Sequence, residues 1–565
     1  MVYLNIYFIG FLKLFFIRTL CYIFSIYFYF FNLIYLLEWD FIYFTDLRFN
    51  IVFFFDFFFF FFLGSVFFIS SLVIYYSYYY IDSCFTENRF FFLVIIFIYS
   101  IILFLISPNL VSIFLGWDGL GVISYILVIY YRNFDSINSG ILTILRNRIG
   151  DISLIFRVWY RIRYLGGARF LFWDKIDFFL LIIILVTGFT KRAQLPFSSW
   201  LPFAIAAPTP VSSLVHSSTL VTAGVFLFFR FSYIWDLNIS LFLSRRGCLT
   251  MLVSGLCGSF ETDLKKVIAL STLSQLGLII TMLGIGIFDI CFFHLIMHAI
   301  FKSSLFMRIG CKIHECFSLQ DSRFISFNWK HPFLIFCFSV TNLSLVGFPF
   351  ISGFYSKDLR IELRISILSS NLLNLIIILR VCLTIGYRFK FLMASGLTNS
   401  FFFSVNCSKK TDLIPFKSLP LLLILRIFLG YFFLKFFYDD IIIIDMFVFQ
   451  KFSILWGIFF TTILFINIFF NKDSISFLKI NSNIFFSSLF FLRELTTYGK
   501  YYLRKFFIIN KILDSGWVEY RGGLYIKTYI SKIFYWLEIK NWVNQLNFIF
   551  IIFFVLLVIF FYSLF

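Results

Sequence analysis

Residues 289–310, with the sequence DICFFHLIMHAIFKSSLFMRIG, decide the class of this protein. The stretch can cross a bilayer as a helix, because about 20 mostly apolar residues span the hydrocarbon core. It carries His294, His298 and Lys302, which are spaced i, i+4 and i+8 and therefore lie on one face of a helix. An ionisable group inside a spanning helix is costly and is a candidate functional group. The sequence thus predicts a membrane helix with a row of titratable side chains.

The rest of the chain has the same apolar character. Of its 565 residues, 61% are hydrophobic and only 13% are charged, which excludes a soluble enzyme, a disordered protein and a secreted scaffold. About fourteen to sixteen apolar runs approach the length of a membrane span. Barrel strands would instead alternate polar and apolar residues over short segments. We therefore expect an all-α polytopic membrane protein.

The pattern of runs and charges predicts five regions. We expect N-terminal transmembrane helices in 1–106, a central core in 107–400, further transmembrane helices in 401–472, an amphipathic helix region in 473–545 and a C-terminal transmembrane anchor in 546–565. In the fourth region charges become dense among aromatic residues and isoleucines. This mixture favours a helix that lies along a surface or against partner subunits over a solvated loop region.

Two apolar segments are interrupted in the same way. Residues 187–197 (TGFTKRAQLPF) and 346–358 (VGFPFISGFYSKD) both contain Gly and Pro, and each carries a lysine, Lys191 or Lys357. A single lysine at a helix end commonly just extends to the membrane interface. Two such segments instead favour a transporter built from inverted repeats, with its sites at broken helices.

Other polar residues also lie in apolar surroundings. Asp118 is flanked by apolar sequence and three glycines in 115–124, which leaves open a functional carboxylate, a structural ion pair or a capped kink that the glycines allow. Arg148 and Asp151 are three residues apart on a helix and are expected to form a structural, neutralising pair. His216 lies in a segment of small residues that suits close helix packing.

A proton path explains His294, His298 and Lys302 better than a metal site does. Histidine titrates near neutral pH, and the charge state of a buried lysine responds to nearby charges. The pair of histidines at i, i+4 lacks the glutamate of an HExxH zinc motif, and the ten cysteines include no CxxC pair.

Six motifs occur together and in one order along the chain. They occupy residues 115–124, 147–151, 207–224, 263–277, 298–306 and 353–358. With them the chain resembles the antiporter-like membrane subunits of mitochondrial NADH:ubiquinone oxidoreductase (respiratory complex I), and most of all the distal, lateral-helix-bearing members from insects. The resemblance is close over about residues 45–390.

The resemblance implies a fold and a function. The fold is an antiporter-like bundle with two inverted repeats containing broken helices, plus a C-terminal lateral amphipathic helix. Residues 107–400 would be the proton-translocation core of a multi-pass protein of the mitochondrial inner membrane. Proton translocation would be coupled to NADH oxidation and ubiquinone reduction in other subunits, so the chain is part of a translocase enzyme.

The resemblance also implies cofactors and partners. No cofactor or metal is expected in this chain, because FMN, the iron–sulfur clusters, NADH and ubiquinone belong to other subunits. The expected partners are other membrane-arm subunits, especially the neighbouring antiporter-like subunits that the lateral helix contacts, and lipids such as cardiolipin. Nucleic acid is not expected. The alternatives are an Mrp-type cation/proton antiporter subunit and a non-pumping scaffold of the membrane arm.

Carried over residue by residue, the resemblance predicts a proton relay. Its members are Asp118, Lys191, His216, His294, His298, Lys302 and Lys357. In this relay Asp118 acts electrostatically on Lys191, the histidines and Lys302 form the centre, and Lys357 faces the far aqueous side.

The net charge of +19 is unusual for so apolar a chain. At Arg146, Arg192 and Arg308 the resembling sequences usually carry a small residue, serine at the first two. Methionine is also scarce, with 7 residues. One hypothesis covers both observations: AGA and AUA codons, which invertebrate mitochondria translate as Ser and Met, stand here as Arg and Ile.

Overall fold

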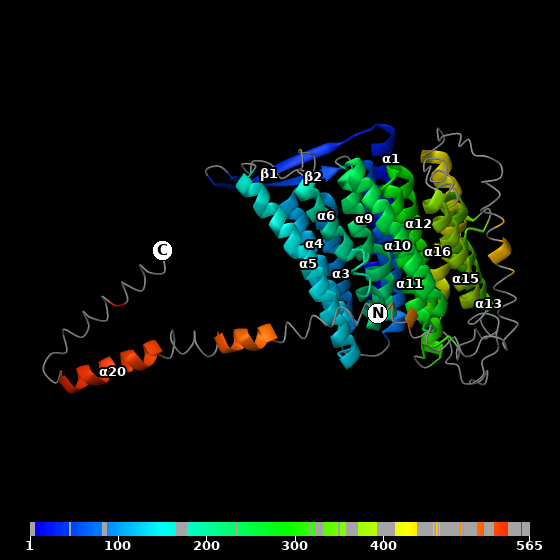
Figure 1. Cartoon of the computed structure of the whole chain (residues 1–565). Helices are drawn as coiled ribbons and strands as arrows, with labels where there is room; N and C mark the ends of the chain where they lie inside the picture. Colours follow the sequence, from blue (N-terminus) through cyan, green and yellow to red (C-terminus); the bar gives the residue numbers. More distant parts are fainter. Residues whose placement is uncertain are drawn as a thin grey trace, which may run out of the picture. The chain divides into compact units, whose positions relative to one another are not determined.

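The fold is a bundle of long helices with one β-hairpin (Figure 1). The computed structural model describes residues 6–44, 47–81, 87–164, 178–232, 235–316, 319–322, 332–348, 351–357, 371–392, 413–437, 485–486, 505–513 and 525–540, with isolated positions between 456 and 555. The contacts between residues divide the chain into two compact units, Met1–Phe490 and Phe491–Phe565.

Within the described residues, eight segments are long and apolar enough to cross a membrane. They are α1 (Ile6–Phe30), α2 (Phe57–Tyr80), α3 (Glu87–Ile106), α4 (Leu110–Val128), the composite segment Thr209–Arg230, α10 (Leu237–Phe260), α11 (Leu264–Leu283) and α12 (Phe288–Glu315). The other long helices of the first unit are α5 (Phe134–Tyr164), α6 (Phe178–Lys191), α13 (Pro332–Val346), α15 (Asn371–Leu392) and α16 (Leu413–Phe437).

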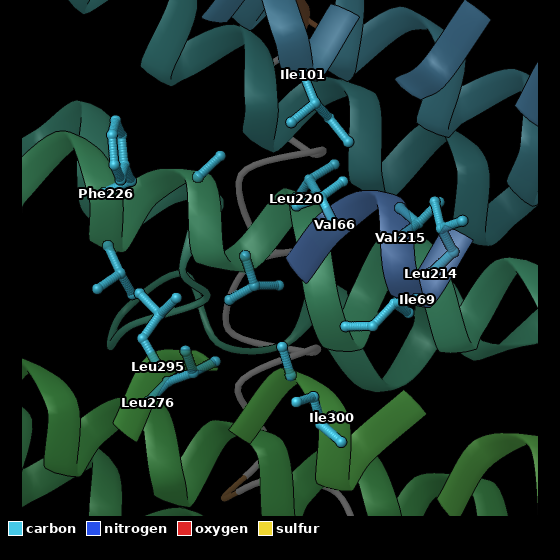
Figure 2. Packing of buried hydrophobic residues seen from close by; sticks show 14 of the residues in the cluster. Val66, Ile69, Ile101, Leu214, Val215, Leu220, Phe226, Leu276, Leu295 and Ile300 are labelled. Atoms are coloured by element: carbon cyan, nitrogen blue, oxygen red, sulfur yellow. The ribbon is translucent and has the colours of Figure 1, made fainter. Parts of the chain in front are cut away.

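Helices α2 and α12 are among the most deeply buried of the spanning helices. α2 is hydrophobic on all sides, and both helices are buried over most of their length. Figure 2 shows Val66 and Ile69 of α2 and Leu295 and Ile300 of α12 among the residues of one continuous core. The ionisable face of α12 is therefore enclosed by protein.

The segment between α6 and α10 is broken into short pieces, as the Gly/Pro pattern predicts. α6 ends at Lys191 and is followed by α7 (Trp200–Phe203), a 3₁₀ turn (Ala204–Ala206) and α8 (Thr209–Val211). A π-helix (η2, Ser212–Thr219) then leads into α9 (Leu220–Arg230). A π-helix is rare and is found most often at functional sites.

The sequence prediction did not include the β-hairpin. Strands β1 (Tyr35–Phe44) and β2 (Leu47–Phe55) pair antiparallel from Tyr35 opposite Phe55 to Phe44 opposite Leu47. Polar residues interrupt this aromatic stretch, so it is a poor membrane span, and strand pairing satisfies its backbone groups. The hairpin lies at the end of the bundle where α2 begins (Figure 1).

The second unit contains a helix at 505–513 and α20 (Tyr525–Lys540). Large apolar side chains such as Phe507, Ile512 and Ile526 are exposed on these helices. Most of the predicted 473–545 helix region, and the predicted anchor 546–565 apart from Val555, lie outside the described residues.

Candidate functional site

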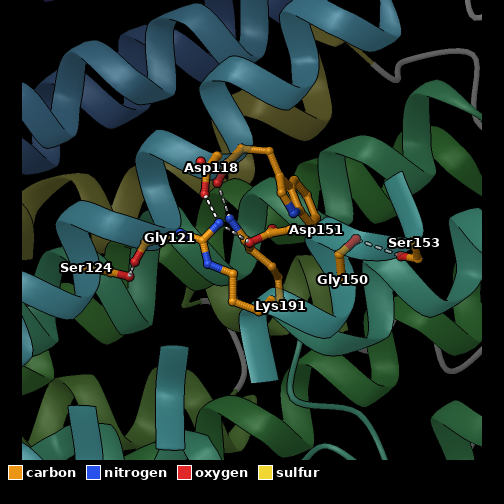
Figure 3. Close-up of polar contacts among 9 residues, drawn as sticks. Asp118, Gly121, Ser124, Gly150, Asp151, Ser153 and Lys191 are labelled. Carbon is orange, nitrogen blue, oxygen red and sulfur yellow. Dashed lines mark hydrogen bonds and ion pairs between the residues drawn. The ribbon is translucent and has the colours of Figure 1, made fainter. Parts of the chain in front are cut away.

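A first cluster of charges joins α4 and α5. Arg148 Nη1 lies 2.9 Å from Asp118 Oδ1 and 3.4 Å from Asp151 Oδ2 (Figure 3). The Arg148 and Asp118 side chains are 44% and 34% exposed, whereas that of Asp151 is 4% exposed. Arg148, expected to pair with Asp151 alone, therefore bridges both carboxylates.

Lys191 ends α6 beside this cluster and is completely buried. Its Nζ donates a hydrogen bond to the Trp117 carbonyl oxygen at 2.6 Å and lies 4.2 Å from the centroid of the Trp117 ring. The carboxylates of Asp151 and Asp118 act on it electrostatically. Asp118 and Lys191, which the sequence analysis paired, thus lie in one cluster. Arg148 binds Asp118, and the Trp117 carbonyl oxygen binds Lys191.

A second cluster lies along α12. His294, His298 and Lys302 are all buried, and the two imidazole centroids are 6.2 Å apart. Lys302 Nζ donates to Ser271 Oγ of α11 at 2.6 Å. His294 Nδ1 lies 3.1 Å from Ser356 Oγ.

Lys357 directly follows Ser356 in the second broken segment. It is buried, and its Nζ donates to the Val346 carbonyl oxygen at the end of α13 at 2.6 Å. The contact between His294 and Ser356 therefore joins the row on α12 to the segment that carries Lys357. His216 lies on the π-helix, but its side chain is outside the described residues.

The sequence analysis missed four groups that shape these clusters. Trp117 and Ser271 hold the two lysines, and Ser356 meets His294. Arg388 of α15 also donates to Ser271 Oγ, at 2.6 Å. Three of the four lie inside the quoted motifs, but their roles depend on contacts between distant helices.

Two buried arginines lack adequate partners. Arg308 Nε, Nη1 and Nη2 and Arg192 Nε and Nη1 have no hydrogen-bond partner among the described residues. Arg192 Nη2 donates to the Gly224 carbonyl oxygen, and its guanidinium lies 3.8 Å from the centroid of the Phe228 ring. Burying a charge without a counter-ion costs several kcal/mol. A serine, which the codon hypothesis expects at both positions, carries no charge and would not incur this cost.

Acidic, cysteine and histidine side chains do not gather into a metal site in the part of the chain that the structure describes. The described site residues are cations, carboxylates and imidazoles, of which Lys191, Lys302, Lys357, Asp151, His294 and His298 are buried.

Known proteins are similar to this chain in sequence over most of its length. A family model described as "NADH:quinone oxidoreductase/Mrp antiporter, TM" matches residues 107–384. NADH-ubiquinone oxidoreductase chain 5 of Aedes aegypti is 37% identical over 523 residues, which are 90% of each chain. The Locusta migratoria protein of the same name is 38% identical over 79% of this chain and 82% of its own length.

The chain belongs to the NADH-ubiquinone oxidoreductase chain 5 family. It is a proton-translocating membrane-arm subunit of respiratory complex I, the H⁺-translocating NADH:ubiquinone oxidoreductase, and works with the other subunits of that complex. It is a multi-pass protein of the mitochondrial inner membrane.

A solved structure supports the fold independently. A chain of the Mrp complex from Dietzia sp. aligns with a TM-score of 0.60 at 20% identity, over 81% of this chain and 57% of that one. The antiporter-like fold expected from the sequence is confirmed.

Proposed function

We propose that the two clusters form one proton relay, which runs from Lys191 through the row on α12 to Lys357. The observation that carries the proposal is the enclosed row His294, His298 and Lys302, whose first member meets Ser356 beside Lys357 at 3.1 Å. Protonatable groups inside a membrane protein mark ion pathways when they line up in this way.

The first cluster supplies an electrostatic switch for the relay. Asp118 binds Arg148 at 2.9 Å, and both side chains are more than one third exposed, so the pair is weak. When a change elsewhere in the complex moves Arg148, both carboxylates act on Lys191 alone and hold its proton. When Arg148 returns, Lys191 releases the proton. Coupled groups of this kind share their titration steps.

The second cluster moves the proton onward. Lys302, held by the Ser271 hydroxyl, passes its proton to His298 and His294, and the Ser356 hydroxyl connects them to Lys357. Ordered water bridges any gap longer than a hydrogen bond. The family resemblance assigns His216, in the π-helix segment, to the centre of the same relay.

The proposal extends to the cofactors and to the surroundings of the chain. The chain holds no redox group of its own, and FMN, the iron–sulfur clusters, NADH and ubiquinone act in other subunits. The exposed apolar side chains of α20, together with Lys527 and Lys532, suit contact with neighbouring antiporter-like subunits and anionic lipids such as cardiolipin.

The experiment is proton translocation by complex I that carries Lys302→Ala or Lys357→Ala in this chain. We expect both variants to lower the protons moved per NADH oxidised and the coupled NADH oxidation rate. Lys266→Ala, which removes a lysine that is 41% exposed and paired with Asp263, is the control. Full pumping stoichiometry in the Lys302 and Lys357 variants would refute the relay and favour a non-pumping scaffold.

A further inference from the structure

The two ends of α12 lie at opposite ends of the bundle. α2 begins next to the β-hairpin, and Asp56 at its start binds Arg230 at the end of α9. Tyr79, at the far end of α2, lies with its hydroxyl 3.4 Å from His314 Nδ1. The C-terminal end of α12 is therefore at the end of the bundle remote from the hairpin (Figure 1).

That end of α12 carries a buried ion pair. Lys312 Nζ lies 3.3 Å from Glu315 Oε2, and each side chain is only 3% exposed. Charges at the end of a spanning helix ordinarily extend into water. A buried pair contributes little stability, because the loss of hydration offsets the attraction between the charges. An enclosed pair in this position is therefore a candidate functional site.

Lys312 lies on the same side of α12 as His294, the first residue of the relay. Lys312 is 18 residues beyond His294, which is about five turns at about 3.6 residues per turn, so both side chains lie on one side of α12. From His294 to Glu315 the helix rises about 31 Å at about 1.5 Å per residue, close to the thickness of the hydrocarbon core. His294 and Lys312 thus lie on one side of α12, Lys302 lies about a quarter of a turn from both, and together these groups extend along the length of the helix.

Position 308 lies between Lys302 and Lys312 along α12, on the side of the helix that carries Lys312 and about a third of a turn from Lys302. A serine there, as the codon hypothesis expects, would place a hydroxyl on the path, where the buried Arg308 places an unpaired guanidinium.

We propose that the Lys312–Glu315 pair is the site where this chain takes up protons from the aqueous side remote from the hairpin and passes them to Lys302. The Glu315 carboxylate accepts a proton from water, its ion pair with Lys312 opens, and the proton moves along α12 to neutral Lys302. The carboxylate is then restored and re-forms the pair. This inference rests on the relay proposed above, since it supplies Lys302 with its proton.

The test uses complex I reconstituted in vesicles, with Glu315→Gln in this chain. Because general acid–base groups contribute strongly to proton-transfer rates, we expect coupled turnover to fall on the order of tenfold, with recovery when the uptake side is acidified. Asp263→Asn is the matched control. Asp263 and Lys266 form a pair with the same i, i+3 spacing, but it is partly exposed, and a backbone bridge from Asp263 to Asp321 places it near the end of α12.

A double variant, Lys312→Met with Glu315→Leu, separates uptake from a structural role. Apolar residues of similar size can replace a purely structural buried pair without loss. The uptake proposal predicts that the double variant assembles but still pumps poorly. Normal pumping by Glu315→Gln or by the double variant would overturn it. If Lys302→Ala loses pumping while Glu315→Gln keeps it, the relay stands and only the uptake site fails.

Discussion

Two arginine–aspartate pairs in this chain differ in geometry. Replacing the aspartate by asparagine should therefore have different effects in the two pairs. Arg148 and Asp118 share one contact of 2.9 Å, with side chains 44% and 34% exposed. Arg230 and Asp56 share two contacts, of 2.6 and 2.7 Å, with side chains 11% and 9% exposed. The first pair suits a switch, and the second suits a fixed link between α9 and the start of α2.

The free energies follow from this geometry. An exposed pair contributes about 0.2–1 kcal/mol, so Asp118→Asn should barely change the stability of the assembled complex. Removing one partner of a buried pair costs about 3–5 kcal/mol, because the other charge is left unpaired. For Asp56→Asn this equals about two to four orders of magnitude in the folding equilibrium, at about 1.4 kcal/mol per factor of ten.

The assay measures two quantities for each variant. One is the amount and thermal stability of assembled complex I, and the other is the number of protons moved per NADH oxidised by each assembled complex. We expect Asp118→Asn to assemble normally and pump poorly, and Asp56→Asn to assemble poorly while each assembled complex pumps well. Normal pumping by Asp118→Asn, or an equal pumping defect in both variants, would refute the switch.

Two further predictions concern packing and residue identity. A Cβ at Gly188 would clash with the buried Phe228 ring, so Gly188→Ala should lower stability by about 1–3 kcal/mol. Gly258→Ala is the control and should be tolerated, because a Cβ at Gly258 would lie 3.7 Å from the nearest atom. Equal thermal stability of the two variants would contradict the packing argument. Mass spectrometry of the purified subunit should find serine at Arg192 and Arg308, and tryptic cleavage at either position would disprove the codon hypothesis.

The sequence predicted those parts of the site that depend on local spacing. The row on α12 follows from the i, i+4, i+8 pattern, and Gly and Pro mark the breaks near Lys191 and Lys357. These features need only one helix at a time, so periodicity and turn chemistry are sufficient to predict them.

Contacts between distant segments could not be predicted in this way. The Trp117 carbonyl that holds Lys191 and the Ser271 hydroxyl that holds Lys302 are ordinary groups in their own helices. Ser100 and Ser124, for example, merely donate to carbonyl oxygens of their own helices. Only the contacts of the Lys191 side chain with α4 and of the Lys302 side chain with α11 give Trp117 and Ser271 their roles.

The hairpin was missed for a different reason. Aromatic residues are common both in the helices of this chain and in strands, so residues 35–55 carry a weak signal for either. The run of phenylalanines at 57–62 has no periodicity, because α2 is buried on most sides.

The central claim is that Lys302 gives up and regains a proton, and Lys302→Arg in assembled complex I tests it most directly. Arginine keeps the positive charge and nearly the same length, but it does not release its proton in proteins. The relay predicts that this variant assembles normally and loses the proton translocation that passes through this chain. Wild-type proton translocation per NADH oxidised in Lys302→Arg would contradict the account, because a fixed charge at Lys302 would then be sufficient.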